Sequence, residues 1–175
     1  MQFQRRGSLN DGDHGLSLIY RAVAGSHLYG LAHADSDDDY FEIVDYRPES
    51  KSRYAKQVIN GNTDVLTTNL STFMLYADKG VPQYLEQMFH RFPVVDGLSS
   101  LRSAFVPSYW QTQATYQRTI RHSWDNGTFK SQRHAWRLWF NLQDLVVYGR
   151  FDPRLSDEQK DEIYWLMRRG QIPDP

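Results

Sequence analysis

The chain of 175 residues contains no cysteine, so disulfide bonds and thiolate metal sites are excluded. It has no apolar run approaching the roughly eighteen residues of a membrane-spanning helix. Its opening residues, MQFQRRGS, lack the apolar core of a signal peptide. These absences predict a soluble, cytoplasmic protein without a membrane partner. The length suits one globular unit with a substantial core.

The chain also has little net charge, −1, which by itself gives no reason to expect a nucleic-acid partner. The charge is unevenly distributed, because residues 102–137 contain six basic residues and one acidic residue, Asp125. Aromatic residues are interleaved with the basic ones, a combination that binds phosphates and stacks on bases. Large aromatic side chains are also needed in a helical core. Nucleic-acid contact and a core role for the aromatic residues both remain open for this region. Its basic residues are Arg102, Arg118, Arg121, Lys130, Arg133 and Arg137.

A glycine-serine turn followed by two carboxylates is the most informative motif. Gly25 and Ser26 are separated by ten residues from Asp37, and Asp39 follows two positions later. If residues 36–45 form a strand, alternation places Asp37 and Asp39 on one face and Asp38 on the other. Magnesium is usually held by one or two carboxylates together with substrate phosphates. The motif therefore predicts phosphoryl or nucleotidyl transfer.

Other interpretations of this acidic segment fail on spacing. An EF-hand loop starting at Asp35 would require glycine and glutamate where Tyr40 and Tyr46 stand. A P-loop starting at Gly25 would require lysine and serine or threonine at positions 31 and 32, which hold leucine and alanine. A solvated acidic turn is the plain alternative, and the glycine-serine turn at the right distance favours a catalytic motif.

The order of predicted elements indicates an α+β fold. Strands are expected at residues 17–24, 37–45 and 64–69, with a further short strand at 54–59 and a short helix at 27–33. Helices are expected at residues 70–79, 82–91, 108–121, 130–149 and 156–169. We therefore predict a small mixed sheet with a helical C-terminal lobe, divided into residues 1–80 and 81–175 and packed as one compact unit.

At the glycine-serine turn and the DxD pair, the chain resembles the DNA polymerase β nucleotidyltransferase superfamily. Within it, the sequence is similar to the small prokaryotic and phage family of predicted nucleotidyltransferases associated with RNA repair. The resemblance implies a polymerase β-like sheet core as the catalytic unit. It extends over residues 17–170 and is carried by the segments GSHLYG (25–30), DVLTTNLSTF (64–73), PQYLE (82–86) and KSQRHAWR (130–137).

The resemblance implies a set of metal-binding carboxylates. Asp37 and Asp39 would be catalytic and would bind two magnesium ions, with manganese as an alternative metal. Asp64, at the start of the next predicted strand, would be the third catalytic and metal-binding carboxylate, on the side of the acceptor hydroxyl. From its residue type alone, Asp64 is equally explained as a loop-capping residue after Gly61.

The resemblance also implies where a nucleoside triphosphate binds. Gly25 and Ser26 would hold the triphosphate, because the helix that follows the turn offers unpaired backbone N–H groups. Lys130, His134 and Arg137 would reach the nucleotide as a source of positive charge. Their separations of four and three residues place them on one face of the predicted helix. A solvated polar face is the alternative for this row.

The expected reaction is template-independent transfer of a nucleoside monophosphate to an RNA 3′ end, with release of pyrophosphate. The association of the similar family with RNA repair makes tRNA the leading acceptor and a bacterial or phage-infected cytosol the expected compartment. Two alternatives remain: an AMPylating enzyme of the toxin-antitoxin kind that modifies a protein, and a non-catalytic nucleotide- or RNA-binding module. The predicted RNA contacts are Arg118, Arg121 and Arg133.

Overall fold

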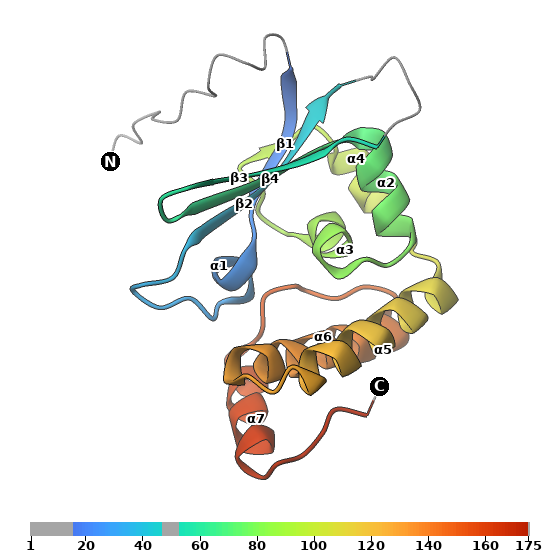
Figure 1. Cartoon of the computed structure of the whole chain (residues 1–175). Helices are drawn as coiled ribbons and strands as arrows, with labels where there is room; N and C mark the ends of the chain where they lie inside the picture. The colour runs from blue at the N-terminus through green and yellow to red at the C-terminus, as the bar shows by residue number, and fades with distance from the viewer. Residues whose placement is uncertain (1–15, 47–52, 175) are drawn as a thin grey trace.

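The computed structural model describes residues 16–46 and 53–174. Within them the protein has an α+β fold, in which a five-stranded mixed sheet is combined with seven helices (Figure 1). No helix in this described part of the chain has the length and apolar character to span a membrane. The strands are β1 (Ser17–Val23), β2 (Asp38–Asp45), β3 (Ala55–Asn60), β4 (Thr63–Asn69) and β5 (Val95–Asp96).

The strands lie in the order β3-β4-β2-β1-β5. β2 and β4 run parallel, whereas the other three neighbouring pairs are antiparallel. In the parallel pair, Asp39 of β2 is directly opposite Asp64 of β4. Because directly opposite residues of neighbouring strands project to the same face of a sheet, this register brings the side chains of Asp39 and Asp64 to the same face.

Some of the helices begin at a residue that stabilises the first turn. The side chain of Asn69 accepts a hydrogen bond from the backbone of Thr72, and Ser156 forms a capping box with Gln159. Pro82 occupies the first turn of its helix. The helices are α1 (Gly25–Tyr29), α2 (Leu70–Asp78), α3 (Pro82–Phe89), α4 (Ser99–Ala104), α5 (Tyr109–Asp125), α6 (Phe129–Tyr148) and α7 (Asp157–Arg168).

The predicted short helix at residues 27–33 is wrong in its limits. α1 begins at Gly25 and ends at Tyr29, because Gly30 adopts the left-handed conformation that terminates helices. β5 and α4 were not predicted, since two and six residues are too short to give a periodic signal.

One hydrophobic core joins the sheet to the helices. It contains Tyr20 and Phe41 from the sheet, Phe73 from α2, Tyr116 from α5 and Leu138 from α6. Figure 1 shows α3 between the sheet and the α5–α6 pair. The predicted division at residue 80 stays a prediction. The sheet itself includes chain from both sides of that position, because β5 pairs with β1.

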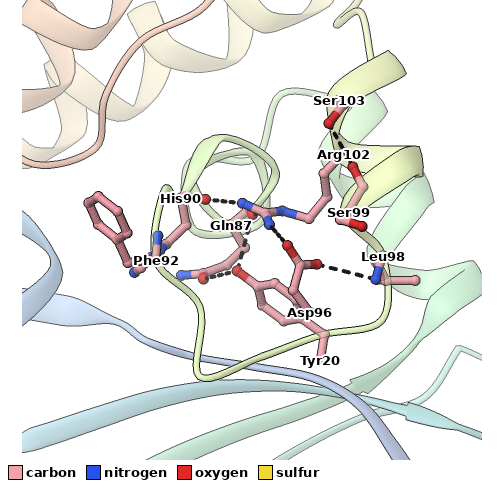
Figure 2. Close-up of polar contacts among 9 residues, drawn as sticks. All are labelled: Tyr20, Gln87, His90, Phe92, Asp96, Leu98, Ser99, Arg102 and Ser103. Carbon is pink, nitrogen blue, oxygen red and sulfur yellow. Dashed lines mark hydrogen bonds and ion pairs between the residues drawn. The ribbon is translucent and has the colours of Figure 1, made fainter.

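A buried arginine ties α4 to the sheet (Figure 2). Arg102 forms an ion pair with Asp96, and its guanidinium also donates hydrogen bonds to the backbone carbonyls of Gln87, at 3.0 Å, and His90. The guanidinium lies over the ring of Tyr20, 5.3 Å from its centroid. Arg102 therefore belongs to the interior, although it was counted in the basic stretch of the sequence.

Arg102→Ala is expected to destabilise the fold by about 3 kcal/mol, because it removes the ion-pair partner of Asp96 and one hydrogen bond from each of the buried carbonyls of Gln87 and His90. Arg118→Ala, on the exposed surface of α5, removes the same charge and should change stability by less than about 0.5 kcal/mol. Urea unfolding followed by circular dichroism measures both. Equal stability of the two variants would contradict the structural role of Arg102.

Candidate functional site

The turn between β1 and α1 packs against Asp39 of β2. The backbone N–H of Ala24 donates a hydrogen bond to the carbonyl of Asp39 at 2.8 Å. Gly25 adopts φ +56°, and a Cβ built on it would lie 1.7 Å from Oδ2 of Asp39. A side chain at position 25 would therefore have to displace the Asp39 carboxylate, and it would also be strained by the positive φ.

Of the three consecutive aspartates, Asp38 lies apart from the other two. Asp37 and Asp39 line one cavity, whereas Oδ1 of Asp38 lies 3.5 Å from Nε2 of His27. The strand begins at Asp38, so Asp37 is the last residue of the preceding loop and Asp39 is held within the sheet. The DxD spacing thus presents two carboxylates together, one on a loop and one on a strand.

The cavity that receives these carboxylates has a volume of about 800 Å³, within the usual range of about 300–1,000 Å³ for small-molecule sites. It lies where α1 and the loop before β2 approach the adjacent ends of α5 and α6 (Figure 1). Acidic groups come from Asp35, Asp37 and Asp39, and basic groups come from α6. The sequence-predicted residues that line it are Gly25, Ser26, Asp37, Asp39, Lys130, Arg133, His134 and Arg137.

The carboxyl group of Asp39 is under electrostatic strain. Burial raises its pKa above the ordinary value, and the neighbouring carboxylates of Asp64 and Asp37 raise it further. Lys130 and His27 oppose this effect. A bound cation would relieve the repulsion among the three carboxylates, so the local charge favours a metal or another positive group here.

Asp64 lies on the other side of Asp39, in a second cavity of about 280 Å³ that is also lined by Gln57 and Glu86. The two cavities share Gly25, Tyr29 and Asp39. Oδ2 of Asp64 accepts a hydrogen bond from Gln57 at 2.6 Å, whereas its Oδ1 is buried and has no hydrogen-bond partner among the described residues. A buried carboxylate oxygen without a partner suits a cation ligand.

The three carboxylates do not by themselves form a closed metal cage. Among residues 16–46 and 53–174, no three His, Cys, Asp or Glu side chains converge as a group that could hold a metal ion. Magnesium keeps several water ligands or uses substrate phosphates to complete its octahedron. Asp37, Asp39 and Asp64 are therefore suited to hold magnesium together with a phosphorylated substrate rather than alone.

Lys130, His134 and Arg137 differ sharply in their surroundings, although all three line the large cavity. Lys130 is exposed. Arg137 is only 1% exposed and donates a 2.7 Å hydrogen bond to Glu86. Burial and the nearby Arg137 lower the pKa of His134 to about 3. A neutral His134 brings no positive charge to the cavity near pH 7, and its predicted contact with the nucleotide stays a prediction. The burial of Arg137 excludes a fully solvated face for this row.

Glu86 and Tyr29 were missed as parts of the site. The hydroxyl of Tyr29 donates to Glu86 at 2.8 Å, and the guanidinium of Arg137 lies 3.6 Å from the centroid of the Tyr29 ring. In the sequence, Glu86 was noted only as part of the segment PQYLE (82–86) that resembles the nucleotidyltransferase family. The available signal was an acidic residue between the apolar residues of α3, Leu85 and Met88, because a buried carboxylate requires a basic partner.

The basic stretch divides into interior and surface residues. Arg102 and Arg137 are buried in ion pairs, and the aromatic residues Tyr116 and Trp136 are buried as well. Arg133 donates a 3.4 Å hydrogen bond to the hydroxyl of Tyr164 on α7. Exposed members remain along α5 and the start of α6, namely Arg118, Arg121, Lys130, Trp110 and Phe129.

Comparisons with protein-family models and with curated proteins found no match. No protein-family model matches the chain. No curated protein matches it at a significant level. The function is therefore argued from the cavity and the residues around it.

Proposed function

We propose that the protein is a metal-dependent nucleotidyltransferase with a polymerase β-like core. The observation that carries this proposal is the large cavity, where Asp37 and Asp39 share one space with Lys130 and the turn at Gly25 lies against the Asp39 carboxylate. This arrangement suits a magnesium-bound triphosphate, because the carboxylates match the metal and the lysine matches the phosphates.

In this proposal the larger cavity binds the triphosphate, and the smaller cavity lies on the side of the acceptor hydroxyl. Asp37 and Asp39 would hold magnesium with the triphosphate, and Asp64 would hold magnesium on the acceptor side. The metal would supply charge neutralisation at the phosphates and a lowered pKa of the attacking hydroxyl. Gly25 and Ser26 would bring backbone N–H groups to the triphosphate. The acceptor hydroxyl would lose its proton to solvent and its oxygen would bond to the α-phosphorus. The bond from that phosphorus to the α,β-bridging oxygen would break, and pyrophosphate would leave.

The proposed acceptor is the 3′ end of an RNA, with tRNA first. This proposal is supported by exposed residues on α5 and α6. Arg118 and Arg121 could contact RNA phosphates, and Trp110 and Phe129 could stack on bases. A protein acceptor is the second candidate. The observation in its favour is that Arg102 and Arg137 are internal, so the basic stretch presents fewer free charges than the sequence suggested.

Incubation with each α-labelled nucleoside triphosphate and magnesium tests the acceptor. One set of reactions receives total tRNA and the other receives cell protein, with the Asp39→Asn variant as the matched control. Label on tRNA that depends on Asp39 supports the RNA proposal. Label on protein alone moves the assignment to protein modification, and no label in either set favours a non-catalytic module.

Asp64→Asn should damage the chemical step more than nucleotide binding. Asp64 lies in the smaller cavity beyond Asp39, so its loss removes the acceptor-side carboxylate and leaves the triphosphate side intact. We expect kcat to fall about a hundredfold or more, whereas the Kd for the magnesium nucleotide changes less than about threefold. Single-turnover kinetics and calorimetry separate the two quantities. An equal loss of both would remove Asp64 from this role.

RNA affinity should depend on salt through the arginines of α5. Arg118→Gln and Arg121→Gln should each flatten the slope of log affinity against log salt by about one unit, because each contact with an RNA phosphate releases a counterion. Lys56→Gln, on the edge strand β3, is the control and should leave the slope unchanged. RNA binding insensitive to salt and to both arginines would favour the protein acceptor.

A further inference from the structure

A hydrogen-bonded chain leads from α3 to the wall of the large cavity. Nη1 of Arg137 donates to Oε1 of Glu86 at 2.7 Å, and Nη2 of the same arginine lies 3.1 Å from Nδ1 of His134. A guanidinium has only donors. Nδ1 of His134 must therefore accept, so the neutral imidazole carries its proton on Nε2.

Arg137 has little freedom to turn away from this arrangement. Glu86 and Arg137 are each 1% exposed. The face of the guanidinium is covered by Tyr29 at 3.6 Å, and the Tyr29 hydroxyl binds the other carboxylate oxygen of Glu86 at 2.8 Å. The lowered pKa of His134 agrees with an uncharged ring. The orientation and the tautomer of His134 are consequently fixed by its buried neighbours.

We propose that Arg137 is a positioning residue that holds His134 as an uncharged Nε2–H donor in the nucleotide cavity. This inference rests on the proposed function and specifies its substrate recognition. The partner of the Nε2–H group is an uncharged acceptor atom of the nucleoside, either on the base or on the ribose. Lys130, whose charge acts on Asp39, serves the triphosphate instead.

The division of labour follows from charge and position. A triphosphate requires cations, which a neutral histidine does not provide. His134 lies one helical turn beyond Lys130 on α6, beside the buried Arg137. A fixed, partly buried donor is well suited to discrimination, because a nucleoside without the matching acceptor would leave that donor unsatisfied.

The tautomer is tested directly on the wild-type protein. Long-range proton-nitrogen correlation spectra at pH 7 should show His134 neutral, with its proton on Nε2. Arg137→Lys keeps a positive charge beside Glu86 but removes the planar donor to Nδ1, and the Nε2–H population should fall. A protonated His134, or a proton on Nδ1, in the wild-type protein would overturn the inference without any reference to activity.

The ligand is tested by comparing nucleotides with inorganic tripolyphosphate. Calorimetry with magnesium should show that His134→Phe weakens binding of the preferred nucleoside triphosphate roughly five- to tenfold, the loss of one good hydrogen bond. Tripolyphosphate binding should stay unchanged. His134→Gln, whose amide also donates, should restore most of the affinity. Equal weakening of nucleotide and tripolyphosphate would overturn the proposal in favour of a phosphate contact.

Two further arms separate the possible sources of the acceptor atom. Loss of preference among the four bases in His134→Phe assigns the contact to the base, and loss of preference for ribose over 2′-deoxyribose assigns it to the sugar. A wild-type protein that has the Nε2–H tautomer but binds no nucleotide would overturn the ligand and the proposed function together. Nucleotide binding by a protein whose His134 carries its proton on Nδ1 would overturn the positioning role of Arg137 and leave the proposed function standing.

Discussion

Asp39→Asn is expected to reduce nucleotidyl transfer at least about a thousandfold, equivalent to roughly 4 kcal/mol of transition-state stabilisation. Asp39 lies at the junction of the two cavities, so its carboxylate would serve both the triphosphate and the acceptor side. The substitution keeps the shape of the side chain. The fold should persist, because a neutral amide removes the repulsion that raises the pKa of this carboxyl group.

Asp38→Asn is the matched control for this prediction. It makes the same chemical change at the neighbouring position, but Asp38 lies beside His27, 3.5 Å away, rather than in the cavity. Transfer should be retained, and circular dichroism should show the same fold for both variants. Wild-type turnover in Asp39→Asn, or an equal loss in Asp38→Asn, would contradict the assignment of the DxD pair.

Gly25→Ala is expected to reduce transfer at least about a hundredfold, because the Asp39 carboxylate must move or the turn must open. The added methyl group would lie 1.7 Å from Oδ2 of Asp39, and φ at position 25 is +56°. The unfavourable backbone conformation alone should destabilise the fold by about 1–2 kcal/mol. Steady-state kinetics and urea unfolding measure the two effects.

Gly61→Ala separates backbone strain from the clash with Asp39. Gly61 has nearly the same φ, +60°, but a Cβ there would meet no described atom within 4 Å. This variant should lose comparable stability and keep its transfer activity. If Gly25→Ala and Gly61→Ala behave alike in both assays, the close approach of Gly25 to Asp39 has no functional importance.

Local patterns in the sequence were sufficient for most of the sheet and for the DxD pair. The predicted strand at 37–45 differs from β2 by one residue, because the segment is rich in aromatic and β-branched residues, which favour strands. The DxD spacing also indicated that Asp37 and Asp39 lie together, although Asp37 lies in the loop before β2. The limits of α1 could not be predicted in this way, since they depend on the positive φ angles that Gly25 and Gly30 adopt.

The long-range parts of the site were not encoded in any local pattern. Asp64 comes beside Asp39 only because β2 and β4 pair in parallel, a pairing that spacing along the chain does not specify. Arg137 was predicted as a nucleotide contact from the family resemblance, and its spacing from Lys130 indicated only that the two residues share a helix face. Its burial depends on Glu86, 51 residues earlier in the chain, and a helical periodicity carries no information about such a partner.

The position of the transferred label tests the central claim most directly. Wild-type protein with magnesium and total tRNA should be given the same nucleoside triphosphate labelled either at the α-phosphate or at the γ-phosphate, in parallel with Asp39→Asn. Nucleotidyl transfer predicts that the α-label becomes acid-insoluble and that the γ-label is recovered as pyrophosphate, both dependent on Asp39. Transfer of the γ-label to the acceptor, or release of the γ-label as orthophosphate alone, would contradict it.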